Sequence, residues 1–208
     1  MKYINNVDEI TEYLIEEKVL LMQTDTVFGL VCRGDSEQAT KRVEDIKQRD
    51  HNAFGYFFRD INMAEKYVKI DTEQKKNIFK KVFPGFFTLI FEATDYAMKI
   101  LPNQAFGINK IGKKTLGVRI PDNKIILKAM QKTDIFFPLL ATSANISKHP
   151  TPTSFESIDE QIINRVDAIV YDKNVKHNAF NSTIIDLSTD KIEVIRKGSG
   201  DLSLINIY

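Results

Sequence analysis

Polar and cationic residues gather in five short groups whose donors suit an anionic ligand. In chain order the groups are residues 23–26, residues 47–49, Thr115 with Arg119, residues 142–145 and residues 196–198. Each group lies where a predicted strand or helix ends, and ligand groups in α/β proteins collect at such ends. Guanidinium, ammonium and hydroxyl groups are donors to phosphates and carboxylates. The five groups together therefore indicate one site for such a ligand.

The segment 138–147 carries the clearest of these signals. Its apolar run stops at Thr142, Ser143 and Asn145, and Pro150 and Pro152 follow. This pattern is typical of a buried strand that ends in a tight polar loop. For this segment alone, turn formation explains the hydroxyl and amide groups better than ligand binding does. The other four groups shift the balance toward a ligand.

Lys47 and Arg49 end a helix predicted over residues 36–49. Positive charge stabilises a helix C-terminus by about 0.3–1 kcal/mol, which is a sufficient structural explanation. The alternative is phosphate binding, where each charge-assisted hydrogen bond contributes about 1.5–3 kcal/mol. The two side chains can share a ligand only if the helix ends before Arg49.

Four more side chains have both a structural and a functional explanation. Thr24 and Thr26 point to the same side of an extended chain. They either hold a small polar ligand or pair across strands. Arg119 lies in an apolar strand, where a charge requires a partner, an open face or a ligand, and we favour a ligand. Arg196 ends another strand, where surface exposure is the simpler explanation.

Strand-like and helix-like segments alternate along nearly the whole chain. Apolar spacing and capping residues predict helices over 8–17, 36–49, 72–83, 125–132 and 155–165. Apolar, β-branched and aromatic runs predict strands over 19–22, 27–32, 54–58, 87–92, 115–120, 138–141, 168–171, 182–187 and 192–195. We therefore expect residues 1–208 to form a single α/β domain with a mixed sheet.

Composition excludes several classes of protein. No apolar run approaches the roughly 20 residues that span a bilayer, and the N-terminus has no signal-peptide core. The one cysteine, Cys32, lies in an apolar run and excludes an internal disulfide. The three histidines lack the spacing of metal ligands. These features predict a cytoplasmic protein with no membrane segment, a core cysteine and no metal site.

The net charge of +1 argues against a chain coated in nucleic acid. Residues 99–132 nevertheless hold eight Lys and Arg against one Asp, which suggests one localised anionic partner. Lys124, Lys128 and Lys132 follow a four-residue spacing, so a solvated helix face explains these three. The glycine-rich loops that bind nucleotides in other folds are absent. Any nucleotide site is therefore of another type.

The same polar groups, in the same order, resemble the YrdC/TsaC family of threonylcarbamoyl-adenylate synthases. The family's K-x-R and S-x-N signature is intact as Lys47, Arg49, Ser143 and Asn145. Five further motifs match: Q-T-D-T-V-F-G-L at 23–30, F-P-G-F-F-T-L at 83–89, T-L-G-V-R-I-P at 115–121, S-T-I-I-D at 182–186 and R-K-G at 196–198. The resemblance extends over about residues 10–200.

The resemblance implies a twisted mixed sheet with flanking helices around a large basic cavity. It also implies ATP-dependent synthesis of threonylcarbamoyl-AMP from L-threonine and bicarbonate or CO2, with release of pyrophosphate. Mg²⁺ is expected with ATP, held largely by phosphates and water. Downstream tRNA-modification proteins would then transfer the threonylcarbamoyl group to an adenosine of tRNA. Such a reaction needs positioning and charge neutralisation more than a protein nucleophile.

The resemblance also assigns roles position by position. It gives the catalytic signature as Lys47, Arg49, Ser143 and Asn145. It places ATP against Arg49, Thr115, Ser143, Thr151 and Arg196. It places threonine against Thr24, Thr26, Arg119 and Ser182.

Six positions depart from the family pattern: Gln23, Ala53, Phe54, Phe58, Ala141 and Lys148. Phe58 stands where some members have a histidine that contacts threonine, and Ala141 lacks a polar group that some members use for threonine. We therefore expect ATP binding to be retained and threonine use to be weaker, or the acceptor to differ. Two alternatives stay open: a YciO-type paralogue without settled activity, and a module that binds double-stranded RNA or tRNA.

Overall fold

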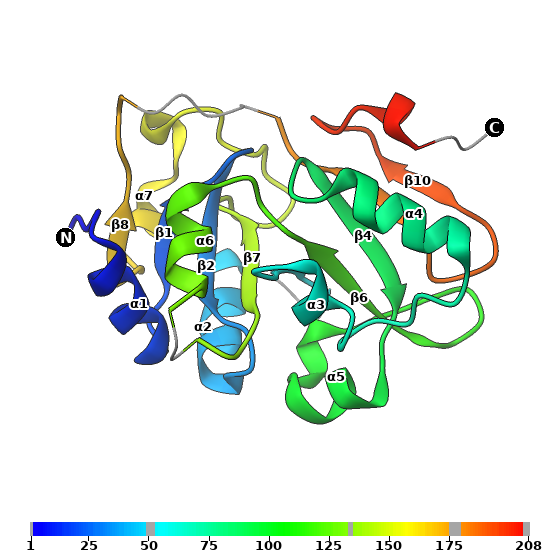
Figure 1. The fold of residues 1–208 in the computed structure, drawn as a ribbon. Helices are drawn as coiled ribbons and strands as arrows, with labels where there is room; N and C mark the ends of the chain where they lie inside the picture. Colours follow the sequence, from blue (N-terminus) through cyan, green and yellow to red (C-terminus); the bar gives the residue numbers. More distant parts are fainter. Residues whose placement is uncertain (1, 49–52, 133–134, 175–179, 206–208) are drawn as a thin grey trace.

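The computed structural model describes residues 2–48, 53–132, 135–174 and 180–205. Its strands form one twisted ten-stranded sheet in the order β10-β9-β4-β6-β3-β7-β2-β1-β8, with β5 paired to β6 (Figure 1). The strands are β1 Leu20–Gln23, β2 Phe28–Arg33, β3 Gly55–Phe57, β4 Phe87–Glu92, β5 Gly107–Ile108, β6 Lys114–Arg119, β7 Leu139–Ser143, β8 Ala168–Val170, β9 Thr183–Asp186 and β10 Glu193–Arg196. Three pairs are parallel (β1–β8, β3–β6 and β4–β9) and the others are antiparallel, which confirms the predicted mixed sheet.

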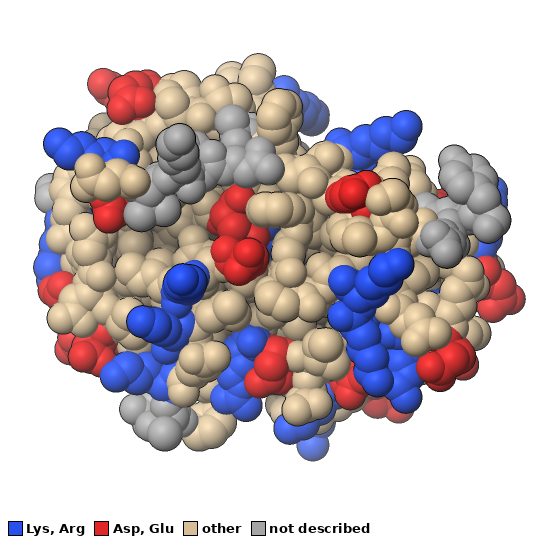
Figure 2. Space-filling view, turned by 45° about the horizontal axis from the view of Figure 1, so that its top comes forward, with Lys and Arg blue, Asp and Glu red and all other residues tan. Residues whose placement is uncertain are grey.

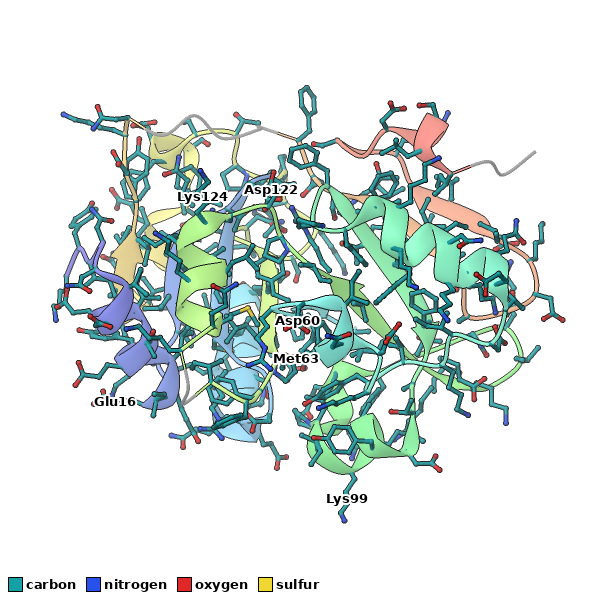
Figure 3. All side chains as sticks on the ribbon, viewed as in Figure 1. Glu16, Asp60, Met63, Lys99, Asp122 and Lys124 are labelled. Atoms are coloured by element: carbon teal, nitrogen blue, oxygen red, sulfur yellow. The ribbon has the colours of Figure 1, made fainter. Side chains whose placement is uncertain are left out.

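Helices connect the strands and begin at polar capping residues. The α-helices are α1 Val7–Ile15, α2 Glu37–Lys47, α3 Ile61–Ala64, α4 Glu73–Val82, α5 Asp95–Ile100, α6 Lys124–Met130 and α7 Glu160–Ile163, and the 3₁₀ helices are η1 Asn103–Ala105, η2 Phe155–Ser157 and η3 Leu202–Leu204. Ser36 caps α2 by accepting from the Ala39 N–H at 3.1 Å. Asp60 caps α3 by accepting from the Met63 N–H at 2.7 Å, and both residues are labelled in Figure 3.

Two apolar clusters cover the two faces of the sheet. In Figure 1, α1 and α6 lie in front of β1 and β2, and α2 lies behind them. Leu14 of α1 and Met130 of α6 are fully buried in one cluster, and Val43 of α2 and Phe79 of α4 are fully buried in the other. Because each helix buries one apolar stripe, the sheet is held from both sides and its strand ends have fixed positions.

The prediction of a single helix over residues 155–165 is wrong. The chain there forms η2, then an extended residue at Ile158 with ψ 131°, and then α7. The Ser157 hydroxyl bonds the backbone of Ser154 and closes η2, while Asp159 caps α7. Because Ser157 closes the first helix and Asp159 begins the second, the apolar residues of this segment do not form one continuous helix.

Strand β7 continues two residues past its expected end at Ala141. Thr142 pairs with Leu30, and Ser143 pairs with Gly29 of β2. The predicted strand is confirmed, but it ends two residues later than predicted, because the backbone of Thr142 and Ser143 still pairs with β2, and the loop follows Ser143. As a consequence, the Ser143 side chain is carried by a strand.

Cys32 of β2 is fully buried, which confirms its predicted place in the core. Burial raises the pKa of its thiol far above the ordinary value. We therefore expect Ellman's reagent to leave the native protein unmodified and to report one thiol per chain in guanidinium chloride. Rapid modification without denaturant would show that β2 is not packed as described.

The basic residues of segment 99–132 are spread over the molecule. Lys99 on α5 and Lys124 at the start of α6 lie at opposite ends in Figure 3. Lys132 pairs with Asp8, and Lys110 pairs with Glu193. Figure 2 shows Lys and Arg interspersed with Asp and Glu on the face that it presents. Lys99 and Lys124 therefore do not share one surface, and Lys110 and Lys132 are each paired with a carboxylate.

No helix in the described part of the chain has the length and apolar character that a bilayer-spanning segment needs.

Candidate functional site

A cavity of about 230 Å³ opens against the central strands of the sheet. Strands β2, β3, β4, β6, β7, β9 and β10 contribute to its described lining, together with the loops after β1 and before β9. Six of the predicted site residues line it: Thr24, Thr26, Arg119, Ser143, Ser182 and Arg196. These residues are far apart in the chain, so only the strand order brings them to one wall.

Small residues on neighbouring strands form the floor of the cavity. Gly117 of β6 pairs with Gly55 of β3, and Gly55 pairs with Ala141 of β7. The side chains of paired residues point to the same face of a sheet. The row formed by Gly117, Gly55 and Ala141 therefore carries a single side-chain group, the methyl of Ala141. A Cβ atom on Gly55 would lie 3.5 Å from the Ala141 carbonyl oxygen, which is an ordinary contact. The backbone therefore does not require glycine at this position, and the missing side chain leaves room for a ligand.

Gly55→Val is expected to fill the cavity without unfolding the protein. Valine suits a strand, and its Cβ fits the backbone, but its methyl groups would occupy the space above the floor. We expect at least about tenfold weaker binding of ATP by isothermal titration, with a nearly unchanged melting temperature. Gly55→Ala is the graded control and should give an intermediate affinity. Wild-type affinity in Gly55→Val would show that the ligand does not bind above this floor.

Thr24 and Thr26 lie side by side on one wall. Their hydroxyl oxygens are 3.1 Å apart, and the Thr24 hydroxyl donates to the Val27 carbonyl at 2.6 Å. Arg119 Nη1 donates to the Thr26 hydroxyl at 2.9 Å. The hydrogen bonds therefore run in one direction, from Arg119 through Thr26 and Thr24 to the backbone. The prediction that both threonines share one side is confirmed.

Arg119 is buried beside a carboxylate. Its Nη2 lies 2.8 Å from Asp25 Oδ2, and the two side chains are 7% and 6% exposed. The contact is close but poorly aligned: among the described residues, Nη2 makes no hydrogen bond of good geometry, and Asp25 Oδ1 has no hydrogen-bond partner. Burial lowers the pKa of Arg119, while Asp25 opposes that change. A ligand carboxylate at this wall would complete the hydrogen bonds of the guanidinium.

Arg196 lies at the opposite wall, at the end of β10. Its Nε and Nη2 donate to the Ser182 carbonyl at 3.1 and 3.0 Å, and Nη2 also contacts the Ser182 hydroxyl at 3.2 Å. The chain can pass this close because residue 198 is glycine: a Cβ on Gly198 would lie 2.1 Å from the Asn181 carbonyl oxygen. The Arg-x-Gly sequence thus fixes the distance between β10 and the segment before β9.

The cavity carries excess positive charge. Partial burial lowers the pKa of Arg196, and repulsion from Arg119 lowers it further. Within the described residues, Arg119 is paired with Asp25, whereas Arg196 has no carboxylate partner. The described lining contains no Asp or Glu. Two guanidinium groups that repel each other across a cavity without carboxylates favour a bound anion.

Lys47 joins the helix end to the loop after β7. Its Nζ donates to the carbonyl oxygens of Ser143 and Asn145 at 2.5 and 2.8 Å, and contacts Asn145 Oδ1 at 3.3 Å. The Ser143 hydroxyl donates to the same Oδ1 at 2.6 Å. Gln48 adopts a left-handed conformation with φ 50° and ends α2. Lys47 is absent from the described cavity lining, so its direct contacts orient the serine and asparagine.

Three predicted site residues remain: Thr151, Thr115 and Arg49. Thr151 accepts from the Asn181 amide at 3.2 Å, and Asn181 lines the cavity. Thr115 is buried in β6 beside Gly107 and is absent from the described lining. Arg49 falls outside the described residues.

Three residues of the site were not anticipated from the sequence. Asp25 lies between the two threonines and is the partner of Arg119. Thr88 of β4 lines the cavity and bonds the Ser182 hydroxyl at 2.8 Å. Asn181 links the cavity to Thr151. The isolated charge of Arg119 was a signal for an acidic partner, whereas nothing local in the sequence marks Thr88 or Asn181.

The departures from the family pattern have different structural consequences. Phe58 is fully buried and packs edge-on against Tyr67, at 5.1 Å between ring centroids. Ala53 and Ala141 line the cavity with methyl groups. Lys148 has φ 69°, a conformation that favours the glycine of the family pattern. At positions 58 and 141 the structure therefore has apolar groups where the resemblance implies polar ones.

The fold and the site define an α/β protein with a cationic, hydroxyl-lined cavity for an anionic ligand. The family model described as Telomere recombination, which takes in Sua5, YciO and YrdC, matches residues 12–198. The chain therefore belongs to the Sua5/YciO/YrdC family.

Relatives in this family have different names. A Methanocaldococcus jannaschii protein, provisionally named a threonylcarbamoyl-AMP synthase, is 32% identical over 91% of this chain and 86% of its own length. The threonylcarbamoyl-AMP synthase of Pyrococcus abyssi is 27% identical over 89% of this chain and 52% of its own length. The uncharacterized protein YciO of Escherichia coli is 26% identical over 94% of this chain and 90% of its own length. This chain spans about half of the P. abyssi relative.

Solved structures share the fold. Sua5 of P. abyssi complexed with L-threonine superposes with a TM-score of 0.77 at 26% identity, over 92% of this chain and 54% of that one. E. coli YciO superposes with a TM-score of 0.79 at 24% identity, over 98% of this chain and 97% of that one. Both similarities confirm the predicted α/β fold with a twisted mixed sheet.

Proposed function

We propose that this protein is an L-threonylcarbamoyladenylate synthase, a nucleotidyltransferase that joins L-threonine, bicarbonate or CO2 and ATP. The observation that carries the proposal is the pair of guanidinium groups, Arg119 and Arg196, across a cavity whose described lining has no carboxylate. Both organic substrates carry anionic groups, threonine a carboxylate and ATP its phosphates. The relatives named as synthases support the same activity.

The wall that carries Arg119 and the wall that carries Arg196 suit different substrate groups. Arg119 presents its guanidinium to the threonine carboxylate, Thr26 holds Arg119 by accepting from Nη1, and Ser182 supplies a hydroxyl beside Thr88. Arg196 presents donors to the phosphates, and the Ser143 hydroxyl, which donates to Asn145 Oδ1, lines the same cavity. Lys47 acts indirectly, because its hydrogen bonds hold Ser143 and Asn145 in place. The 230 Å³ volume is below the roughly 300–1,000 Å³ of pockets for drug-sized ligands, so the nucleoside of ATP extends past the mouth.

The chemistry requires no nucleophile from the protein. The threonine amine adds to CO2 with loss of a proton, or condenses with bicarbonate with loss of water, to give N-carboxythreonine. A carboxylate oxygen of its carbamate then attacks the α-phosphorus of ATP. The bond from the α-phosphorus to the bridging oxygen breaks, and pyrophosphate leaves with the electron pair. Two anions must approach each other in this step. The two arginines lower that electrostatic cost and hold the reacting atoms in line.

Mg²⁺ has no carboxylate ligands in the described lining, and the described residues hold no cluster of metal-binding side chains. The metal therefore enters as the complex with ATP, held by phosphates and water. The protein's own contribution to charge neutralisation comes from its arginines.

Pyrophosphate release tests the proposed function. With ATP, threonine and bicarbonate present together, we expect continuous release. Omitting threonine or removing bicarbonate should reduce release to the background of a reaction without protein. Equal release in the absence of threonine would reject the synthase activity and leave only ATP hydrolysis.

A second candidate is a YciO-type nucleotide-binding protein with little or no use of threonine. Two observations favour it: Phe58 packs into the core, and Ala141 adds only a methyl group to the cavity. The near-complete match to YciO in both chains also supports it. Separate calorimetric titrations decide between the two candidates. ATP binding without threonine binding, also in the presence of ATP and bicarbonate, would favour the second.

A further inference from the structure

Thr88 lies in the polar centre of the cavity, between the two arginines. Arg196 of β10 pairs with Ile184 of β9, and Ile184 pairs with Thr88 of β4. The next strand, β6, pairs Val118 with Leu89, which places Arg119 beside Thr88 in the same row. Thr88 is therefore the hydroxyl that the sheet register sets between the two cations.

A short hydrogen bond connects this hydroxyl to Ser182. Thr88 Oγ1 and Ser182 Oγ are 2.8 Å apart, and Arg196 Nη2 lies 3.2 Å from the same serine oxygen. The two hydroxyls have two hydrogens, and their mutual bond uses one of them. If Thr88 donates, the serine oxygen accepts from both Thr88 and Arg196, and its own hydrogen is free. If Ser182 donates, the hydrogen of Thr88 is free.

In both arrangements the pair retains one O–H donor for the cavity. That donor sits where the excess positive charge also favours an anion. An isolated serine would turn freely among several staggered positions, whereas the bonds to Thr88 and Arg196 restrict it.

We propose that Thr88 is a positioning residue, which orients the Ser182 hydroxyl toward the carboxylate of the amino-acid substrate. The inference rests on the proposed function and adds a residue that fixes how that substrate binds. A cross-strand pair that serves stability alone would give the same distance, so the test must separate stability from binding.

Thr88→Val keeps the branched shape and removes the hydroxyl, and Thr88→Ser restores a hydroxyl. Both variants are compared in pyrophosphate release with threonine and ATP varied separately. We expect Thr88→Val to raise the KM for threonine about tenfold, with kcat and the KM for ATP within about twofold of the wild type. Thr88→Ser should recover most of the threonine affinity. The melting temperatures should agree closely.

A double-mutant cycle with Ser182→Ala tests whether Thr88 acts through the serine. Once the serine hydroxyl is gone, Thr88→Val should add little further loss of threonine affinity. An equally large additional loss, or an unchanged KM for threonine in Thr88→Val, would overturn the positioning role. If Thr88→Val does not fold, Thr88→Cys enters the same cycle with the same criterion.

The wild-type protein in the same assay separates this inference from the proposed function. Threonine-dependent release in the wild type together with an unaffected Thr88→Val variant removes only the positioning role. No threonine-dependent release in the wild type rejects the synthase activity, and the positioning role is rejected with it.

Discussion

Arg196→Gln is expected to lower pyrophosphate release about a hundredfold while the protein stays folded. The guanidinium has no carboxylate partner in the described residues and bonds only to Ser182. Charge-assisted contacts to phosphate contribute about 1.5–3 kcal/mol each, and about 3 kcal/mol corresponds to roughly two orders of magnitude. Because Arg196 keeps much of its surface exposed and has no ion pair within the described residues, its loss should change the free energy of unfolding by less than about 1 kcal/mol.

Lys197→Gln is the matched control for Arg196→Gln. It removes the same charge from the next residue of the chain, which is exposed and absent from the described lining. We expect nearly wild-type release from this variant. Equal losses in the two variants would mean that net charge, and not the position of Arg196, governs the reaction.

Arg119→Met is expected to lower both stability and activity. Its removal leaves Asp25 buried without a cation, which costs about 3–5 kcal/mol of unfolding free energy. For a chain of this size that loss corresponds to a melting temperature lower by roughly 6–20 °C. Threonine-dependent release should fall below detection, because the carboxylate loses its guanidinium. Calorimetric unfolding and the release assay measure the two effects.

The double variant Asp25→Asn with Arg119→Met separates these two effects. Removing both charges leaves no buried ion uncompensated, so most of the lost stability should return. Activity should not return, because the ligand still lacks its guanidinium. Lys110→Met is the control for an exposed ion pair and should cost less than about 1 kcal/mol. Recovery of activity in the double variant would contradict the role of Arg119.

Much of the sheet could be predicted because its strands are apolar runs between polar stops. The alternation of strands and helices also indicated a mixed sheet. The short helices α3 and α5 were missed, since four to six residues are too few for an apolar period. They form because Asp60 and Thr94 cap them. The helix expected over 155–165 failed for the related reason that local caps outweighed the apolar spacing.

The site was predictable in its residue types but not in its contacts. Two guanidinium groups and several hydroxyls could be read as donors for anions from the sequence alone. The bond between Thr88 and Ser182 spans 94 positions in the chain and depends on β4 lying beside β9. Strand order is set by the whole fold, so no local pattern shows that contact. The same limit applies to Asp25 and its ion pair with Arg119 across 94 positions of sequence.

The product itself tests the central claim most directly. The protein is incubated with ATP, L-threonine and ¹³C-labelled bicarbonate, and the nucleotides are analysed by mass spectrometry. We expect an AMP adduct that contains threonine and one labelled carbon, and we expect its rate of formation to be about a hundredfold lower with Arg196→Gln. An unlabelled adduct, or pyrophosphate release with AMP as the only nucleotide product, would contradict a cavity that joins a carbamate to the α-phosphate.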